Sequence, residues 1–372
     1  MRIAFVYIAE AYQAFHGAGI AIGLARQPGV EIFNFHADPD TPRQLRRIHA
    51  AFGAPPPVTV RLYESVTTRA LRGARYLGAF KERLLRDNRE TLDSFDAIVS
   101  VENTLAFARD VGIERPRLIY SPHGFGDRAY AFVARIAAFD FVLLAGAKTE
   151  AQMLERGLIR PGHYALTGSV KLETATRLAA VEALPFAKAG PTALYNPHFD
   201  PKLTSWTRFI APLLADYATA EDRNLIAAPH VKWFRRSAET TRRRWRDRST
   251  GNVLVDPGSD RSVDGSYLSA ADLYIGDSSS QVYEFLATPR PCLFLNAHGV
   301  DWRDSPNHAH WHLGDVIERP EQLADAIRAA PERHALYNER QEAARLATFG
   351  DGAESASVRS ASVIYEFLDS VR

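Results

Sequence analysis

The chain has very few of the residues that build thiol-based or covalently cross-linked sites. Its 372 residues include one cysteine, Cys292, and two methionines. A single cysteine excludes an internal disulfide and a zinc cluster held by several cysteines. The apolar residues that follow Cys292 predict a buried strand with an inert thiol.

The sequence also lacks long apolar runs and a large excess of charge of either sign. The N-terminal run 3–8 ends at Glu10 and lacks the longer apolar region and cleavage site of a signal peptide. No stretch approaches the roughly 20 apolar residues that span a bilayer. The net charge is +1, which argues against a general nucleic-acid binder. We therefore expect a cytoplasmic protein without a nucleic-acid partner, and peripheral contact with an anionic membrane at the inner face of the cell stays open.

Short apolar runs alternate with helical patterns along almost the whole chain, which predicts an α/β fold with parallel sheets and helical crossovers. Strands are expected in the first half near 3–8, 31–35, 59–62, 97–101, 118–121, 141–145 and 164–167. A second series is expected at 192–196, 224–227, 252–255, 273–276 and 292–295. The pattern 355–368 predicts a final helix.

A glycine and two prolines within 184–191 mark a linker between the two strand series. We predict an N-terminal Rossmann-like acceptor domain over 1–185 and a C-terminal Rossmann-like nucleotide-donor domain over 191–352. The remainder, 353–372, is expected to hold a helix that could pack back on the first domain. Two Rossmann-like domains that face each other across a cleft form the GT-B architecture, which suits a nucleotide-linked substrate but does not define a function.

The first candidate site is a His-Gly loop after the expected strand 117–121. It contains His123, Gly124, Gly126 and Arg128. The glycines let the backbone approach a ligand closely, and Arg128 at the start of the next expected helix could meet an anion. A neutral imidazole could remove a proton from a bound hydroxyl, as a general base does. The alternative is a loop histidine that only satisfies a hydrogen bond.

The second candidate site follows the expected strand 273–276. It contains Asp277, Ser278, Ser279, Ser280 and Glu284. Three successive hydroxyls at a helix N-terminus could bind a phosphate, and Glu284 could bind a ribose. In the alternative interpretation, Ser278 and Gln281 form a capping box that only begins a helix.

Smaller signals lie at other strand ends. Pro229 holds His230 at the exit of the expected strand 224–227, although His230 could also be a surface histidine. Further polar residues at strand ends are Lys171, Asn196, His198 and Lys232.

The order of these motifs resembles the CDP-glycerol glycerophosphotransferase family of teichoic-acid and capsule synthesis. The motifs are the His-Gly loop, Gly-Ser-Val-Lys-Leu-Glu at 168–173, Leu-Tyr-Asn-Pro at 194–197, Ser205-Trp206, Pro-His, Asp-Ser-Ser-Ser and Pro-Cys-Leu-Phe at 291–294. The resemblance covers about residues 115–300. The family has the GT-B fold and transfers an alditol phosphate from a CDP-linked donor to a hydroxyl acceptor, releasing CMP, in the synthesis of cell-surface polymers.

This resemblance implies essential roles for His123, His230, Ser279 and Ser280, with no cofactor and no bound metal. His123 would deprotonate the acceptor hydroxyl, and the other three would hold the donor diphosphate. The sequence departs from the family at Ala228, where the family has lysine, and in 168–173, where the family has Gly-x-Pro-Arg-x-Asp. Lys232 or Arg128 could replace the missing cation.

Two other functional classes stay open. Non-hydrolysing UDP-N-acetylglucosamine 2-epimerases share the GT-B fold and carry an Asp-Ser-Gly-Gly segment similar to the one that begins at Asp277. Another sugar-nucleotide enzyme, such as a glycosyltransferase, would also fit, as would a non-catalytic nucleotide-binding scaffold.

Two further patterns resemble functional sites. His308, His310 and His312 alternate, so a strand would place them on one face as metal ligands, although we expect no metal there. The arginine-rich stretch 242–246 contains Trp245 and could touch anionic lipid or form a solvated basic helix face.

Overall fold

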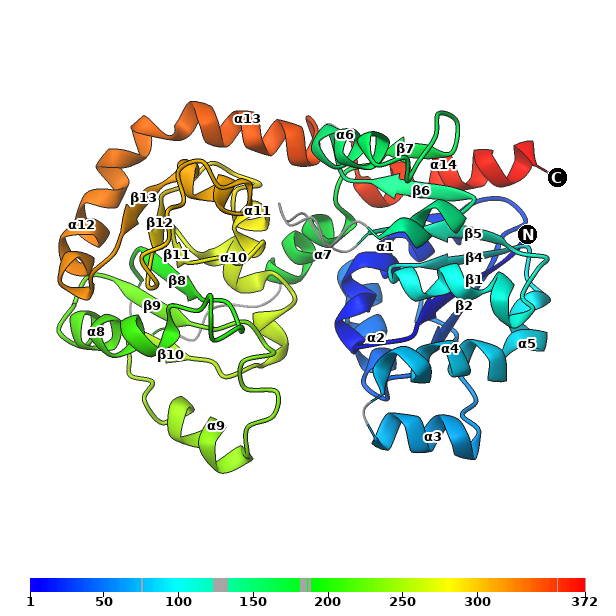
Figure 1. Cartoon of the computed structure of the whole chain (residues 1–372), viewed down its shortest axis with the longest axis horizontal. Coiled ribbons are helices and arrows are strands. Elements are labelled where there is room, and N and C mark those ends of the chain that lie inside the picture. The colour runs from blue at the N-terminus through cyan, green and yellow to red at the C-terminus, as the bar shows by residue number, and fades with distance from the viewer. Residues whose placement is uncertain (75, 123–132, 181–185, 187–188, 353, 372) are drawn as a thin grey trace. The chain divides into compact units, whose positions relative to one another are not determined.

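The computed structural model describes residues 1–74, 76–122, 133–180, 186, 189–352 and 354–371 (Figure 1). Within these residues the chain divides into two compact units. The first contains 1–122, 133–177 and 348–371, and the second contains 178–347. Each unit has one parallel sheet, so the predicted α/β class is confirmed.

The first unit contains a seven-stranded sheet in the order β3-β2-β1-β4-β5-β6-β7, and all neighbouring strands are parallel. The strands are β1 (Arg2–Tyr7), β2 (Glu31–His36), β3 (Thr59–Arg61), β4 (Ala97–Ser100), β5 (Arg117–Tyr120), β6 (Phe141–Leu144) and β7 (Tyr164–Leu166). In the central strand β1, Ile3 to Tyr7 are all buried. Burial on both faces explains why this strand is a continuous apolar run rather than an alternating one.

Helices cover the first sheet. They are α1 (Ala14–Leu24), α2 (Thr41–Ala51), α3 (Val66–Gly73), α4 (Leu77–Asp87), α5 (Arg89–Asp93), α6 (Ala147–Glu155) and α14 (Ala356–Ser370). The C-terminal helix α14 packs against α1. Gly23 makes this approach possible, because a Cβ atom there would lie 2.7 Å from the Cβ of Ala361.

The second unit contains a six-stranded parallel sheet in the order β10-β9-β8-β11-β12-β13. The strands are β8 (Thr192–Asn196), β9 (Asn224–Ala227), β10 (Val253–Val255), β11 (Leu273–Gly276), β12 (Cys292–Leu295) and β13 (Asp315–Ile317). The helices are α8 (Trp206–Ala218), α9 (Glu239–Arg246), α10 (Ser266–Ala270), α11 (Gln281–Phe285) and α12 (Leu323–Arg333). Cys292 is buried on β12, and burial raises the pKa of its thiol, so the expected inert cysteine is confirmed.

The unit boundaries lie inside two helices, α7 (Val170–Ala179) and α13 (Asn338–Phe349). The domain limits expected from the sequence were 185 and 352, and the expected linker at 184–191 lies largely outside the described residues. No helix in the described part of the chain is both long enough and apolar enough to cross a membrane.

The structure differs from the sequence analysis in three places. Strand β13 was not predicted, because it is short and begins with the charged Asp315. The alternating histidines lie in a 3-10 helix, η7 (Pro306–Leu313), rather than a strand, and a proline at its start favours a helical turn. The described part of the helix expected after the His-Gly loop is a 3-10 helix over Ala134–Ala138.

Candidate functional site

The strand order of the second sheet identifies one edge as the natural ligand site. Successive strands run outward from β8 in one direction and from β11 in the other, so the order reverses between these two neighbours. In open α/β sheets, ligands bind at the carboxyl ends of the strands beside such a reversal. The loops after β8, β9 and β11 therefore form the candidate site, and they carry most of the polar residues singled out above.

Asp277, directly after β11, organises this edge from inside the protein. Its side chain is 1% exposed. Oδ1 accepts hydrogen bonds from the backbone N–H groups of His198 (2.8 Å) and Ser278 (2.6 Å). Oδ2 accepts from the backbone N–H (2.6 Å) and hydroxyl (2.8 Å) of Ser205. Burial raises the pKa of the Asp277 carboxyl, although these donors act in the opposite direction. The carboxylate therefore joins the loops after β8 and β11 and is a positioning residue.

The backbone carbonyl of Asp277 is also bound by the protein. It accepts hydrogen bonds from Nε2 of His310 (2.9 Å) and Nε1 of Trp311 (2.8 Å). The other two histidines of η7 bond elsewhere, His308 to the Ser305 hydroxyl and His312 to the carbonyl of Arg303. The three imidazoles thus do not converge, and no group of three metal-ligating side chains is found in the part of the chain that the structure describes.

Two imidazoles come together at the ends of β8 and β9. The ring centroids of His198 and His230 are 6.1 Å apart. Nδ1 of His198 accepts the backbone N–H of Asp200 (3.0 Å), and Nδ1 of His230 accepts that of Lys232 (3.2 Å). A ring nitrogen that accepts a hydrogen bond carries no proton, so each neutral imidazole has its proton on Nε2. In the neutral form of both rings, Nε2 is therefore the hydrogen-bond donor and Nδ1 the acceptor.

Phe199 joins the two imidazoles into one cluster. Its ring lies 4.4 Å from His198 and 4.8 Å from His230, measured between centroids. The ammonium of Lys232 lies 5.0 Å from the Phe199 ring centroid, within the range of a cation–π contact. The edge therefore presents two imidazoles and one ammonium within a small space, a combination suited to an anion.

Asn196, at the end of β8, is structural in this arrangement. It is 2% exposed, and its Nδ2 donates to the carbonyl of Ala228 (2.7 Å). The backbone N–H of His230 donates to the carbonyl of Pro197 (3.0 Å). These two hydrogen bonds fix the loop after β9 against the loop after β8.

The serine loop differs from the capped helix considered above. Helix α11 has five residues and begins at Gln281, and Ser280 at its N-cap makes no side-chain capping bond. The helix thus begins two residues later than a capping box of Ser278 with Gln281 requires, and the Ser279 hydroxyl accepts the backbone N–H of Gln281 (3.4 Å). Because α11 is so short, its dipole adds little to anion binding. Ser278 and Ser279 are buried, Ser280 is exposed, and Glu284 is buried within α11.

Lys171 belongs to the first unit and is 8% exposed on α7. The rest of its motif performs local structural tasks. Gly168 has a φ of +78°, which favours glycine, and the Ser169 hydroxyl accepts the backbone N–H of Leu172 (3.3 Å). Glu173 accepts hydrogen bonds from the hydroxyl of Ser355 and the backbone N–H of Ser357, each at 2.9 Å, and so attaches α14.

The four residues singled out in the His-Gly loop, His123, Gly124, Gly126 and Arg128, lie outside the described residues.

Sequence reasoning missed Phe199 and the role of Ser205. Phe199 follows His198 directly, so a search for aromatic residues beside the polar ones at strand ends could have found it. Ser205 was noted only as part of a motif. No local signal shows that its N–H and hydroxyl bind a carboxylate 72 positions away.

Two Rossmann-like units in one chain, each with a parallel sheet that reverses its order, define the GT-B fold. Solved structures share it over essentially the whole chain. No protein-family model and no curated protein matches the sequence.

Solved structures from two enzyme classes are among those similar to this chain. The wall teichoic acid polymerase TagF has a TM-score of 0.68 and 12% identity, over 100% of this chain and 89% of that one. UDP-N-acetylglucosamine 2-epimerase from Neisseria meningitidis, bound to UDP-N-acetylglucosamine, has a TM-score of 0.64 and 12% identity, over 100% of both chains. The corresponding epimerase from Methanocaldococcus jannaschii has a TM-score of 0.63 and 12% identity, over 98% of this chain and 100% of that one. At these identities the likeness shows the fold.

Proposed function

We propose that the protein is a transferase that moves an alditol phosphate, such as glycerol phosphate, from a CDP-linked donor to a hydroxyl acceptor in the synthesis of a cell-surface polymer. The observation that carries the proposal is the His198–Phe199–His230–Lys232 cluster at the switch point of the second sheet. Two Nε2–H donors and an ammonium match the oxygens of a diphosphate. The likeness of the fold to TagF and the order of the sequence motifs support the same class of reaction.

In the proposed reaction, the acceptor hydroxyl oxygen attacks the distal phosphorus of the diphosphate. The bond from that phosphorus to the bridging oxygen breaks, and CMP leaves with the electron pair. His198, His230 and Lys232 would bind the phosphate oxygens and stabilise the charge that develops on CMP. Asp277 and Asn196 would keep these groups in place through their hydrogen bonds to the loops.

Several sequence-based roles belong to the proposal as well. His123 would accept the proton of the attacking hydroxyl, and Gly124, Gly126 and Arg128 would shape its loop for substrate. Ser278, Ser279, Ser280, Glu284 and Lys171 stay proposed substrate-binding residues. Of the three serines, Ser280 is the exposed one and the best placed to reach a ligand.

An isomerase of the UDP-N-acetylglucosamine 2-epimerase type is the second candidate, favoured by the epimerases with the same fold. The two candidates differ in the nucleotide that they bind. Calorimetry with CDP-glycerol, CDP-ribitol, CMP and UDP-N-acetylglucosamine separates them. The transferase requires a clear preference for the cytidine ligands, and a preference for the uridine ligand would support the isomerase instead. Binding of none of them would contradict both.

A further inference from the structure

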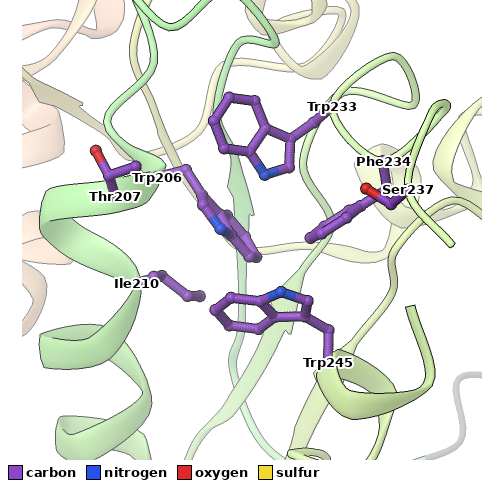
Figure 2. Close-up of a pocket in the computed structure, with 7 residues that line it drawn as sticks. All are labelled: Trp206, Thr207, Ile210, Trp233, Phe234, Ser237 and Trp245. Carbon is purple, nitrogen blue, oxygen red and sulfur yellow. The ribbon is translucent and has the colours of Figure 1, made fainter. Parts of the chain in front are cut away.

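A hollow lies in the second unit, beside the first turn of α8. Its volume is about 470 Å³, within the range of pockets that bind small molecules. None of its lining residues belongs to the cluster proposed to hold the donor. They are Trp206, Thr207, Ile210, Trp233, Phe234, Ser237 and Trp245. Figure 2 shows the indole rings of three tryptophans and the ring of Phe234 around a common space.

The wall of this hollow, which we call the tryptophan pocket, consists of aromatic rings that pack against one another. Trp206 is 3% exposed and packs against Tyr195 on one side, with the two ring planes 2° from parallel. Its ring centroid is 4.9 Å from that of Trp245 and 5.8 Å from that of Phe234. Trp233 and Trp245 are half-buried and border the opening. A pocket walled in this way favours an apolar group.

The pocket also offers polar donors. Among the described residues, no hydrogen bond occupies the indole N–H groups of Trp206, Trp233 and Trp245, and Figure 2 shows the indole nitrogens of the latter two on the sides that face each other. The hydroxyls of Thr207 and Ser237 lie at its border. An apolar ligand that carries oxygen acceptors would use both kinds of group.

The surrounding segment is strongly basic. Residues 232–248 hold Lys232 and seven arginines against Glu239 and Asp247, whereas the whole chain has a net charge of only +1. Two of these arginines adjoin the wall. The guanidinium of Arg248 lies 4.7 Å from the Trp245 ring centroid, and that of Arg242 donates to the carbonyl of Phe234 (2.9 Å). This charge favours an anionic ligand.

We propose that the tryptophan pocket binds an anionic lipid, with part of a hydrocarbon chain inside the pocket and the phosphate group on the surrounding arginines. Apolar walls alone would fit any apolar ligand, and arginines alone would fit any phosphate. Their combination selects a molecule that has both parts. The site goes beyond the proposed transferase activity and does not depend on it.

Monomeric n-alkyl phosphates test the proposal directly. Calorimetry with butyl, hexyl and octyl phosphate, below their micelle concentrations, should show affinity rising by up to roughly fourfold per added methylene until the pocket is full. Inorganic phosphate and octanol, which each have one of the two parts, should bind much more weakly than octyl phosphate. Affinity that is independent of chain length, or equal binding of octanol, would overturn the proposal.

Single substitutions test whether the alkyl phosphates bind in this pocket. Ser237→Phe should fill the space and remove the dependence on chain length. Trp233 is half-buried, so the fold should tolerate its replacement better than that of a core residue. Trp233→Ala should weaken the binding of octyl phosphate at least about tenfold. Arg248→Gln should weaken every phosphate ligand and retain the chain-length dependence. The matched controls are Trp302→Ala and Arg328→Gln, which lie outside the pocket and should bind like the wild type.

Two further experiments distinguish the lipid from a nucleotide and from a membrane surface bound through charge alone. CMP binding should be the same in Trp233→Ala and the wild type, and its selective loss would identify a nucleobase site and overturn the lipid proposal. The wild type should co-sediment with vesicles of phosphatidylglycerol, and much less of the Trp233→Ala variant should do so. Neither protein should co-sediment with vesicles of phosphatidylcholine. Equal sedimentation of both proteins with phosphatidylglycerol would show that surface charge alone binds the membrane, and it would overturn the proposal of a lipid pocket. Because CDP-glycerol binding is measured on the same variants, failure of this proposal and failure of the transferase proposal are distinguishable.

Discussion

At the scale of single residues, His198 and His230 are held by the same kind of hydrogen bond. Each Nδ1 accepts a backbone N–H two positions further along the chain, which leaves the proton of the neutral ring on Nε2. The same loop geometry thus gives both side chains the same tautomer, and both rings lie against Phe199. Sequence alone placed both histidines at strand ends, but it could not supply their tautomers, which depend on local backbone geometry.

Substitutions of His230 separate hydrogen-bond donation from other roles. His230→Ala should weaken the binding of CDP-glycerol about 10- to 100-fold, the loss expected for one hydrogen bond to a charged group. His230→Gln should recover part of the affinity, because its amide N–H reaches the place of Nε2, and His230→Asn should recover none. Calorimetry measures all three, with His312→Ala as the control. Wild-type affinity in all three variants would mean that His230 does not face the diphosphate.

Asp277→Asn tests whether the loops after β8 and β11 depend on one buried carboxylate. The substitution replaces one of the two acceptor oxygens by an NH2 group, which cannot accept the two hydrogen bonds from Ser205 or the pair from His198 and Ser278. At least one buried backbone N–H then stays unpaired, and each such group costs about 1–3 kcal/mol of stability. We expect a lower melting temperature together with weaker binding of CDP-glycerol. The exposed Asp325→Asn is the control, and a melting temperature that stays equal to that of the control would contradict the assigned role.

At the scale of elements, helix α14 is attached to α7 through Glu173. Burial alone would raise the pKa of this carboxyl, but hydrogen bonds from Ser357 and Ser355 and the guanidinium of Arg177 outweigh it and hold the pKa below its ordinary 4.5. A group with a lowered pKa in the folded state stabilises the protein above its ordinary pKa. That contribution is lost as the pH falls through the lowered value.

Glu173→Gln should therefore change the acid dependence of stability. At neutral pH the variant should melt at a lower temperature than the wild type, and the difference should shrink as the pH falls below 4.5. Thermal unfolding followed by circular dichroism from pH 3 to 7 gives both curves. Glu366→Gln, at an exposed position of α14, is the matched control. A difference that is constant over the whole pH range would show that Glu173 acts only through packing.

The elements that sequence predicted well are those with the strongest local signal. β1, β8 and β11 are buried apolar runs bounded by polar residues, so their position follows from composition alone. β13 is short and half-buried, and the histidine alternation in η7 imitates a strand. In both cases, contacts distant in sequence decide the structure. The hydrogen bonds of His310 and Trp311 to the Asp277 carbonyl are of this kind.

At the scale of the whole molecule, sequence gave the α/β class and the GT-B fold, because two series of buried strands with helical crossovers admit few other topologies. It also placed Asn196, His198, His230 and Asp277 at strand ends, and the sheet order brings these ends to one edge. Sequence could not show which of them are buried supports. Asn196, His198 and Asp277 are all buried, and the hydrogen bonds of Asn196 and Asp277 hold the loops that carry the cluster around Phe199.

The most direct test of the account is a product assay. The protein is incubated with CDP-glycerol and a panel of polyol and lipid-linked polyol acceptors, and phosphorus NMR follows CMP and new phosphodiester. A parallel reaction with UDP-N-acetylglucosamine is followed for a change at its C2 centre. The account predicts CMP and phosphodiester in equal amounts, a strong reduction in His230→Ala, and unchanged UDP-N-acetylglucosamine. Epimerised UDP-N-acetylglucosamine with intact CDP-glycerol would contradict it.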